Sequence, residues 1–337
     1  MEATTNGTNS SQPYKTIICY PGQSEGPSVD ANLAQVFKDC GGLESGFPPA
    51  LPNWLKLCLN TTMTSAGRTQ DQVIEDIELG RIHPKDELYH MYRVIMGYGV
   101  LSGALIHQYP SILSEQNIGC AGHSLGTYGS LVLPCALNWF QTTSDEALET
   151  AITNSMQSIA AATRIRGQAA TVEGEMIVIT GGRRNGLDQE NLKQWCQTLQ
   201  KASNGSAEIV LHVTNGIIGV SLDRLSQLAF LSENYPLPNG MRVIKSSVYP
   251  PNHSSLLKRI DQQTCEALSQ TLAANQFVEM PPGMVLHTLL QDGTAVSTVS
   301  AVARHLIFSK HLSRPFHLGG VLQQVPADGD IYPDFPI

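Results

Sequence analysis

Short apolar runs alternate with helical patterns over the first half of the chain. The run 15–20 ends at Pro21-Gly22, as a buried strand entering a tight turn does, and the run 117–121 predicts a second strand. Ser144-Asp145 supplies an N-cap for a long amphipathic helix. The apolar positions of that helix are Leu148, Ile152, Met156 and Ile159. The other helices expected in this half cover 28–40, 72–79, 89–109 and 128–138.

The pattern changes near Glu175 and becomes that of a small α+β unit. Apolar alternation and helical spacing predict the order strand, helix, strand, strand, helix, strand, with Asn215-Gly216 as the turn of the central hairpin. This order is that of a ferredoxin-like unit. Its expected elements cover 176–180, 187–202, 208–213, 216–221, 222–231 and 241–248. From Ser254 onward we expect helices again.

These patterns predict an α/β protein with an insertion. We expect an α/β-hydrolase-like main domain that is built on a parallel sheet and covers 14–172 and 249–322. We expect a ferredoxin-like subdomain, 173–248, to interrupt it. Residues 1–13 are expected to be a disordered tail and residues 323–337 a C-terminal tail.

Composition and charge exclude several classes of function. The chain has 337 residues, of which 42% are hydrophobic and 15% charged, as in a soluble globular protein. A net charge of −8, with no basic run denser than Arg183-Arg184, argues against nucleic acid or an anionic membrane as a partner. No apolar stretch is long enough to span a membrane, and the N-terminus has no signal-peptide pattern.

The seven cysteines are scattered and include no CxxC pair. This pattern indicates reduced, mostly buried thiols in a cytoplasmic protein, with neither a disulfide framework nor a metal site.

The strongest chemical signal is the pentapeptide Gly122-His123-Ser124-Leu125-Gly126. It follows a predicted strand and precedes a predicted helix, which is the context of a nucleophile elbow. In such an elbow the glycines allow a sharp turn, and the helix N-terminus and the next backbone amide stabilise an oxyanion. We therefore predict Ser124 as a nucleophile. A coincidental turn is the alternative, since the pentapeptide alone is only moderately specific.

A serine nucleophile needs a base, and ten histidines are candidates. His253 follows the last strand of the insertion in a Pro-rich loop, Tyr249-Pro-Pro-Asn-His253, of the kind that holds a side chain over a cleft. His123 lies inside the elbow and is expected to point aside. An α/β-hydrolase would need an acid after Ser124 and a late histidine. No candidate acid fits, and the ferredoxin-like insertion is foreign to that fold.

These residues together resemble the acyl-carrier-protein acyltransferase family, typified by malonyl-CoA:acyl-carrier-protein transacylases and polyketide synthase acyltransferase domains. Four features carry the resemblance: Tyr20-Pro21-Gly22-Gln23, Ala121–Gly126, the ferredoxin-like insertion, and the segment Ser247–His253. The segment Leu312–Val321 also resembles the family's Leu-x-x-Pro helix, so the resemblance covers about 14–322.

The resemblance implies a chemistry and partners. Ser124 would attack the thioester of an acyl-CoA or acyl-carrier protein while His253 removes its proton. Gln23 and the Leu125 amide would form the oxyanion hole. The acyl group would then pass to a second thiol or to water, in polyketide or fatty-acid biosynthesis, with no metal or other cofactor.

The substrate depends on one helix register. Malonyl-type members carry an arginine roughly 25 residues after the serine, which pairs with the free carboxylate of the acyl group. Counting with a small insertion after Trp139 puts Thr153 or Asn154 at this position, whereas another register puts Arg166 of Arg166-Gly167-Gln168 there. We favour the first register. Because an unpaired carboxylate in a neutral pocket is costly, this register predicts an uncarboxylated acyl chain.

The predicted pocket residues are Asn154, His123, Tyr249 and Asn252, with Arg166 as the alternative carboxylate-binding residue. Two further departures from malonyl-type members agree with the loss of the arginine. Thr127 stands where many of them have Glu, and the Ser/Thr-Gln-Pro motif is absent near 93–96.

The end of the chain also departs from the family. Members close with a strand and a Gly-Pro-Gly turn that helps to orient the histidine, and Glu279–Gly283 resembles this turn but comes too early. Either the chain is a fragment of a longer synthase, or another group orients His253.

Four functions remain open. We favour a starter-unit transacylase, although those domains usually carry a cysteine nucleophile. An editing acyl hydrolase is an alternative, and a malonyl-CoA:acyl-carrier-protein transacylase is another if Arg166 is the pocket residue. Intact Ser124, His253 and Gln23 argue against a non-catalytic docking module.

Overall fold

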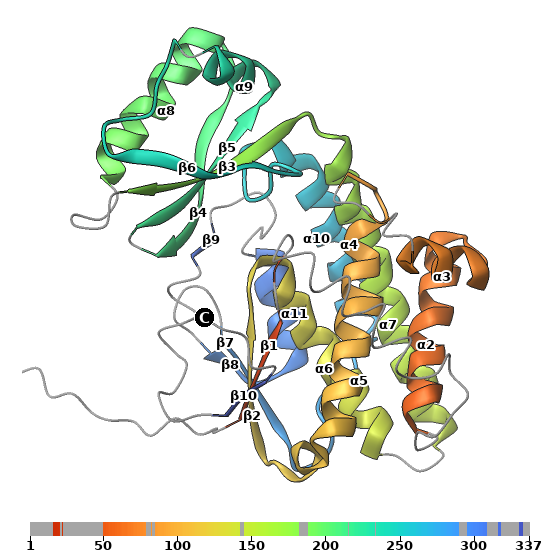
Figure 1. Ribbon diagram of the computed structural model, residues 1–337. Coiled ribbons are helices and arrows are strands. Elements are labelled where there is room, and N and C mark those ends of the chain that lie inside the picture. Colours follow the sequence, from red (N-terminus) through yellow and green to blue (C-terminus); the bar gives the residue numbers. More distant parts are fainter. Residues whose placement is uncertain are drawn as a thin grey trace, which may run out of the picture.

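The computed structural model of the chain contains two sheets, each bordered by helices (Figure 1). The described residues are 16–20, 22, 50–78, 82, 85–141, 145–181, 188–214, 216–232, 234–289, 295–308, 316–317 and 330–332. The helix expected at 28–40 lies outside them.

The main sheet has five strands in the order β10-β1-β2-β7-β8. Its members are β1 (Thr16–Tyr20), β2 (Asn117–Gly122), β7 (Val285–Leu289), β8 (Ala295–Val296) and β10 (Asp330–Tyr332). β10, β1, β2 and β7 run parallel, and β8 is antiparallel to β7. The predicted parallel sheet is therefore confirmed.

The helices of the main domain lie side by side along one flank of this sheet (Figure 1). They are α2 (Ala50–Ala66), α3 (Gln70–Glu78), α4 (Tyr89–Tyr92), α5 (Gly99–Gln108), α6 (Gly129–Gln141), α7 (Glu146–Gly167), α10 (Lys258–Ala273) and α11 (Val299–Phe308). Asp145 caps α7 through its carboxylate, as predicted, by accepting hydrogen bonds from the Ala147 and Leu148 amides.

The helix expected over 89–109 is continuous but changes its winding. A π-helical segment, Arg93–Tyr98, joins α4 to α5. The carbonyl of Gly99, just after this segment, accepts a hydrogen bond from Trp54 Nε1 at 2.7 Å. Such segments are rare and occur often at functional sites.

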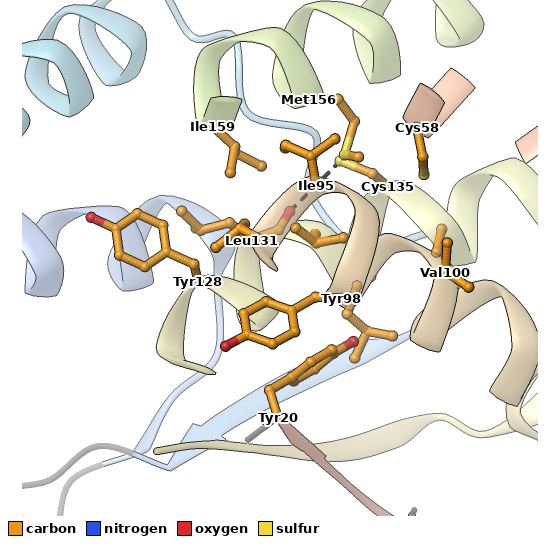
Figure 2. Close-up of a cluster of buried hydrophobic side chains, with 14 of the residues drawn as sticks. Tyr20, Cys58, Ile95, Tyr98, Val100, Tyr128, Leu131, Cys135, Met156 and Ile159 are labelled. Carbon is orange, nitrogen blue, oxygen red and sulfur yellow. Dashed lines mark hydrogen bonds between the residues drawn. The ribbon is translucent and has the colours of Figure 1, made fainter. Parts of the chain in front are cut away.

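The two faces of the main sheet pack against different partners. Ile18 and Tyr20 of β1 join the core under the helices, where Tyr20 meets Tyr98 edge to face at 5.2 Å between ring centroids (Figure 2). Ile17 and Cys19, which alternate with them, face the other way.

The second sheet is the predicted ferredoxin-like unit. Its chain order is β3 (Gly174–Gly181), α8 (Gln189–Ser203), β4 (Ala207–Thr214), β5 (Ile217–Asp223), α9 (Arg224–Leu231) and β6 (Met241–Val248). The antiparallel strand order β6-β3-β5-β4 is that of a ferredoxin-like sheet. Both helices lie on the face of the sheet turned away from the main domain (Figure 1).

The two sheets meet through a small apolar cluster. Ile17, Ala121 and Leu289 come from the main sheet, and Met176, Val210 and Leu211 come from the ferredoxin-like sheet. Burying these side chains joins the subdomains, so that a residue of one subdomain can act on a loop of the other.

The segment after Ser254 departs from the prediction, which expected only helices there. β7 and β8 complete the main sheet, and β10 lies within the expected tail 323–337 but pairs with β1. β10 has only three residues, too few to show the two-residue period of a strand. β7 was missed because Pro281 and Gly283 precede it and are typical of a loop.

One strand also crosses the expected domain boundary. β9 (Phe316–His317), within the segment assigned to the main domain, pairs in parallel with β4 of the ferredoxin-like sheet. The helix expected over Leu312–Val321 is therefore wrong at these two residues, and the rest of that segment lies outside the described residues.

Candidate active site

Ser124 stands at the point where β2 turns into a helix. It opens the 3₁₀ segment Ser124–Tyr128, which continues into α6, and its φ of 53° lies in the left-handed region. A non-glycine residue adopts this conformation only where its surroundings enforce it. Gly122 makes the turn possible, because a Cβ at this position would lie 2.3 Å from the Thr127 nitrogen. The predicted elbow geometry is therefore present.

His253 lies in the loop after β6, the last strand of the ferredoxin-like unit, and contacts Ser124. Its Nε2 lies 2.6 Å from Ser124 Oγ, and the two residues are only 2% and 7% exposed. His253 also has a left-handed φ, 61°, and the loop around it is held by a hydrogen bond from Ser254 Oγ to the Pro251 carbonyl at 2.7 Å. The two residues predicted as nucleophile and base are thus in direct contact.

The segment predicted to supply the oxyanion hole begins beside the elbow. Tyr20 pairs with Gly122 across β1 and β2, and its carbonyl accepts a hydrogen bond from the His123 amide at 3.1 Å. Gly22 packs so closely on His123 that a Cβ there would lie 3.0 Å from Nδ1. Gln23 follows Gly22 but lies outside the described residues. Leu125 is fully buried directly after Ser124.

Arg93 lies next to this segment and is a residue that the sequence interpretation missed. It is 3% exposed and its Nη2 donates a hydrogen bond to the Gly22 carbonyl at 3.2 Å. A buried guanidinium is costly unless polar groups surround it, so this contact restrains the backbone that leads to Gln23. The signal was a lone arginine inside the apolar helix 89–109.

Arg166 occupies a buried position at the end of α7. It is 1% exposed, and its guanidinium lies 5.7 Å from the ring centroid of Tyr128, the last residue of the 3₁₀ segment that Ser124 opens. Tyr128 stands at the edge of the core with its hydroxyl directed away from the other labelled side chains (Figure 2). Burial raises the pKa of Tyr128 to about 12, although the nearby Arg166 charge opposes this rise. Arg166 therefore adjoins the 3₁₀ segment that begins at Ser124.

Two neighbours fix the backbone at Arg166. A Cβ on Gly167 would lie 1.7 Å from the Glu87 carbonyl oxygen, so only glycine allows this approach. His90 makes a hydrogen bond to the Arg166 backbone, and burial, together with the Arg166 charge, lowers the pKa of His90 to about 3. A histidine that stays neutral avoids repulsion with the guanidinium beside it.

Asn154, which the favoured register puts in the acyl pocket, lies on the exposed side of α7. It is exposed and lines an open groove of about 460 Å³ between α7 and α10, together with residues such as Ser158 and Gln270. Ile152 and Met156 of the same helix face the core. Asn154 therefore lies on the outer side of α7, a position that does not favour the predicted pocket role.

The remaining predicted pocket residues lie around the His253 loop. The Tyr249 hydroxyl donates hydrogen bonds to the Ala170 and Val172 carbonyls, at 2.7 and 3.1 Å, so its polar end holds backbone instead of facing Ser124. Asn252 is 4% exposed directly before His253. His123 is partly exposed beside Gly22.

The part of the chain that the structure describes has neither a metal site nor a membrane-spanning helix. It contains no cluster of histidine, cysteine or carboxylate side chains suited to a metal ion. Cys58, Cys120, Cys135 and Cys196 are buried as free thiols, as predicted. Across the same residues, no helix is both long and apolar enough to cross a membrane.

Comparison with known proteins shows the fold. No protein-family model and no curated sequence matches the chain. The acyl-carrier-protein S-malonyltransferase of Bartonella henselae superimposes with a TM-score of 0.57 and 16% identity, over 94% of this chain and 86% of that one. FabD of Acinetobacter baumannii gives a TM-score of 0.57 and 19% identity over the same shares.

A third similar structure contains a carrier protein. It is a malonyl-transacylase in complex with a type II polyketide synthase acyl-carrier protein, with a TM-score of 0.53 and 16% identity, over 92% of this chain and 84% of that one. At these identities the likeness shows the fold alone. It agrees with the fold that the sequence resemblance implies.

Proposed function

We propose that this chain transfers acyl groups from a thioester to the thiol of an acyl-carrier protein through a covalent acyl-Ser124 intermediate. The observation that carries the proposal is the 2.6 Å contact between Ser124 Oγ and His253 Nε2 on a strained elbow at the end of a parallel strand. The likeness to acyl-carrier-protein S-malonyltransferases supports the same chemistry.

In the first half-reaction, Ser124 Oγ attacks the thioester carbonyl carbon while His253 Nε2 takes the hydroxyl proton. The Leu125 amide, with Gln23 by resemblance, would stabilise the oxyanion of the tetrahedral intermediate. Collapse of this intermediate breaks the C–S bond, and the departing thiolate takes the proton from His253. In the second half-reaction, a carrier-protein thiol gives its proton to His253 and attacks the ester carbonyl. Collapse of this intermediate breaks the ester C–O bond, and His253 returns the proton to Ser124 Oγ.

Intact-protein mass spectrometry tests the nucleophile. The wild type, incubated with malonyl, acetyl and hexanoyl thioesters, should gain one acyl group with at least one of them, and Ser124→Ala should gain none. His253→Ala should slow acylation by about 10²- to 10⁴-fold, the usual contribution of a general base. The exposed Ser114→Ala is the matched control. Acylation that survives Ser124→Ala would overturn the assignment, and a wild type that no thioester acylates would favour a docking module.

For the acyl group, the buried guanidinium of Arg166 favours a carboxylated substrate of the malonyl type. The predicted uncarboxylated starter unit depended on Asn154, which lies in the outer groove. Arg166 is held beside the nucleophile segment by Gly167 and His90, and arginine pairs with carboxylates through two parallel hydrogen bonds. We therefore propose malonyl transfer ahead of starter-unit transfer.

Arg166→Gln tests this substrate class. It should lower kcat/KM for a malonyl thioester by about ten- to hundred-fold, the equivalent of a hydrogen bond to a charged group, and leave acetyl transfer unchanged. Arg164→Gln, on the exposed side of the same helix, is the control. Asp261 of α10 is also buried, and its negative charge is close enough to Tyr128 to raise the pKa of that hydroxyl. A wild-type preference for acetyl or hexanoyl groups would overturn the malonyl proposal, as expected if Asp261 neutralises Arg166.

Transfer and hydrolysis differ in the fate of acyl-Ser124. A transferase should keep the acyl group for minutes without a carrier protein and lose it when a carrier protein with its thiol is added. Rapid loss to water without the carrier protein would instead identify an editing acyl hydrolase.

A further inference from the structure

Glu208 joins the ferredoxin-like sheet to the loop that carries His253. It lies on β4, and its Oε2 accepts a hydrogen bond from the Ser255 backbone amide at 2.9 Å. Its Oε1 accepts hydrogen bonds from the Ser255 hydroxyl and, at 3.0 Å, from the Ser206 hydroxyl. One carboxylate therefore receives three donors, two of them from the residue that lies two positions after His253.

These contacts fall where the His253 loop becomes a helix. Ser255 opens a 3₁₀ turn, Ser255–Leu257, that leads into α10, so Glu208 caps this helix from another subdomain. A carboxylate suits a helix N-terminus, because the first backbone amides there lack partners within the helix. Neither the Ser254 nor the Leu257 side chain caps the two successive helical segments.

His253 needs this support because its backbone is strained. Its φ of 61° is unfavourable for a residue with a Cβ and persists only when the surrounding contacts enforce it. Within the loop, the Ser254 hydroxyl and the Asn252 amide bind to carbonyls of Pro251 and Pro250, at 2.7 Å each. The contacts of Glu208 are different, since they fix the loop against the ferredoxin-like sheet.

We propose that Glu208 is a positioning residue for His253. By binding Ser255, it holds the His253 imidazole within hydrogen-bonding distance of Ser124. Proton transfer between these two residues therefore depends on how the ferredoxin-like subdomain packs against the main domain. The inference rests on the proposed function, because it assigns Glu208 a part in acylation of Ser124. The hydrogen bonds of Glu208 go to Ser206 and Ser255, so its effect on Ser124 would pass through His253.

An amide is a weaker partner than this carboxylate. The Ser255 backbone amide can only donate, so a glutamine must turn its oxygen toward it and its NH₂ toward the Ser206 and Ser255 hydroxyls, which would then have to accept. Glu208→Gln therefore removes the charge and weakens the clamp with almost no change in volume. Glu173→Gln is the matched control, since Glu173 is a 68% exposed carboxylate of the same subdomain that pairs with Arg224.

The test is the single-turnover rate of Ser124 acylation by an acyl-N-acetylcysteamine thioester over a range of concentrations. Glu208→Gln should lower the saturating rate by about ten- to hundred-fold without changing the half-saturating concentration, and Glu173→Gln should leave both unchanged. Ser255→Ala removes one donor, leaves the backbone amide in place, and should slow the reaction less. Should Glu208→Gln fail to fold, the acylation rate of Ser255→Ala alone decides whether the clamp positions His253.

A His253→Ala background separates positioning from general loosening of the fold. There, Glu208→Gln should cause no further decrease in rate, because the group it positions is missing. An equal decrease in both backgrounds, or wild-type rates for Glu208→Gln and Ser255→Ala, would overturn the inference. Failure of the wild type to acylate at all would instead overturn the proposed function.

Discussion

The buried His90 beside Arg166 should make the stability of this protein depend on pH in a calculable way. His90 is 1% exposed, and burial, together with the guanidinium of Arg166, lowers its pKa from 6.5 to about 3. Between these two values the unfolded chain binds a proton that the folded chain does not, so protonation favours unfolding. The stability that His90 contributes by remaining neutral is therefore complete above pH 6.5 and is lost as the pH falls toward 3.

The size of this loss in the free energy of unfolding follows from the difference in proton binding between the folded and unfolded chains. Lowering the pH from 7 to 5 changes the proton occupancy of His90 almost wholly in the unfolded state, which corresponds to a loss of about 2 kcal/mol in the free energy of unfolding. Further acidification to pH 3 raises the loss to about 4 kcal/mol, and below pH 3 it approaches a ceiling of about 5 kcal/mol, the equivalent of the full pKa difference.

Urea unfolding of the wild type and His90→Gln at pH 7 and pH 5 measures this effect. The variant is expected to be less stable at pH 7, because it loses the contact with the Arg166 backbone, but to lose about 2 kcal/mol less than the wild type between the two pH values. Other groups, including His287, contribute equally to both proteins and cancel. Parallel pH dependences for the two proteins would refute the assignment of a neutral, buried His90.

Three further predictions concern single contacts. Gly167→Ala should cost several kcal/mol in urea unfolding, because its Cβ would overlap the Glu87 carbonyl, whereas Gly216→Ala, with open space around it, should be within about 0.5 kcal/mol of the wild type. Arg93→Met should slow Ser124 acylation by about tenfold with malonyl and acetyl thioesters alike, since it releases the Gly22 carbonyl; a selective effect on malonyl would contradict this role. Leu228→Gln on α9 should change the free energy of unfolding by less than about 0.5 kcal/mol, because this leucine is 57% exposed.

Much of the fold could be predicted because its signals are local. The ferredoxin-like unit alternates strands and helices with a clear turn at Asn215-Gly216, and each of its elements is long enough to show its period. The elbow is equally local, since five consecutive residues define both the turn and the nucleophile. Strand pairing depends instead on distant residues. β10 therefore escaped prediction, because its three residues become a strand only beside β1.

His253 and Glu208 show the same division within the site. The Pro-rich loop marked His253 from the sequence alone, because such loops hold functional side chains. Glu208, by contrast, lies on a strand in which alternating polar residues are ordinary, and 47 residues separate it from Ser255. Its role depends on the way the two subdomains pack, which no local pattern records.

The preference for Asn154 over Arg166 rested on counting across an insertion, whereas helix geometry favours Arg166 as the inward-facing residue. Ile152, Met156 and Ile159 are buried at spacings of four and three, and the same stripe continues through Thr163 to Arg166, all 1% exposed or less. Asn154 is two residues, or about 200° of rotation, beyond Ile152 and so lies on the opposite side of the helix. An arginine on the apolar stripe of a helix is buried at a cost that only a nearby polar or charged group offsets. The periodicity that predicted α7 thus already places Arg166, and not Asn154, on the buried side of this helix, and it does so without any assumption about the length of the insertion.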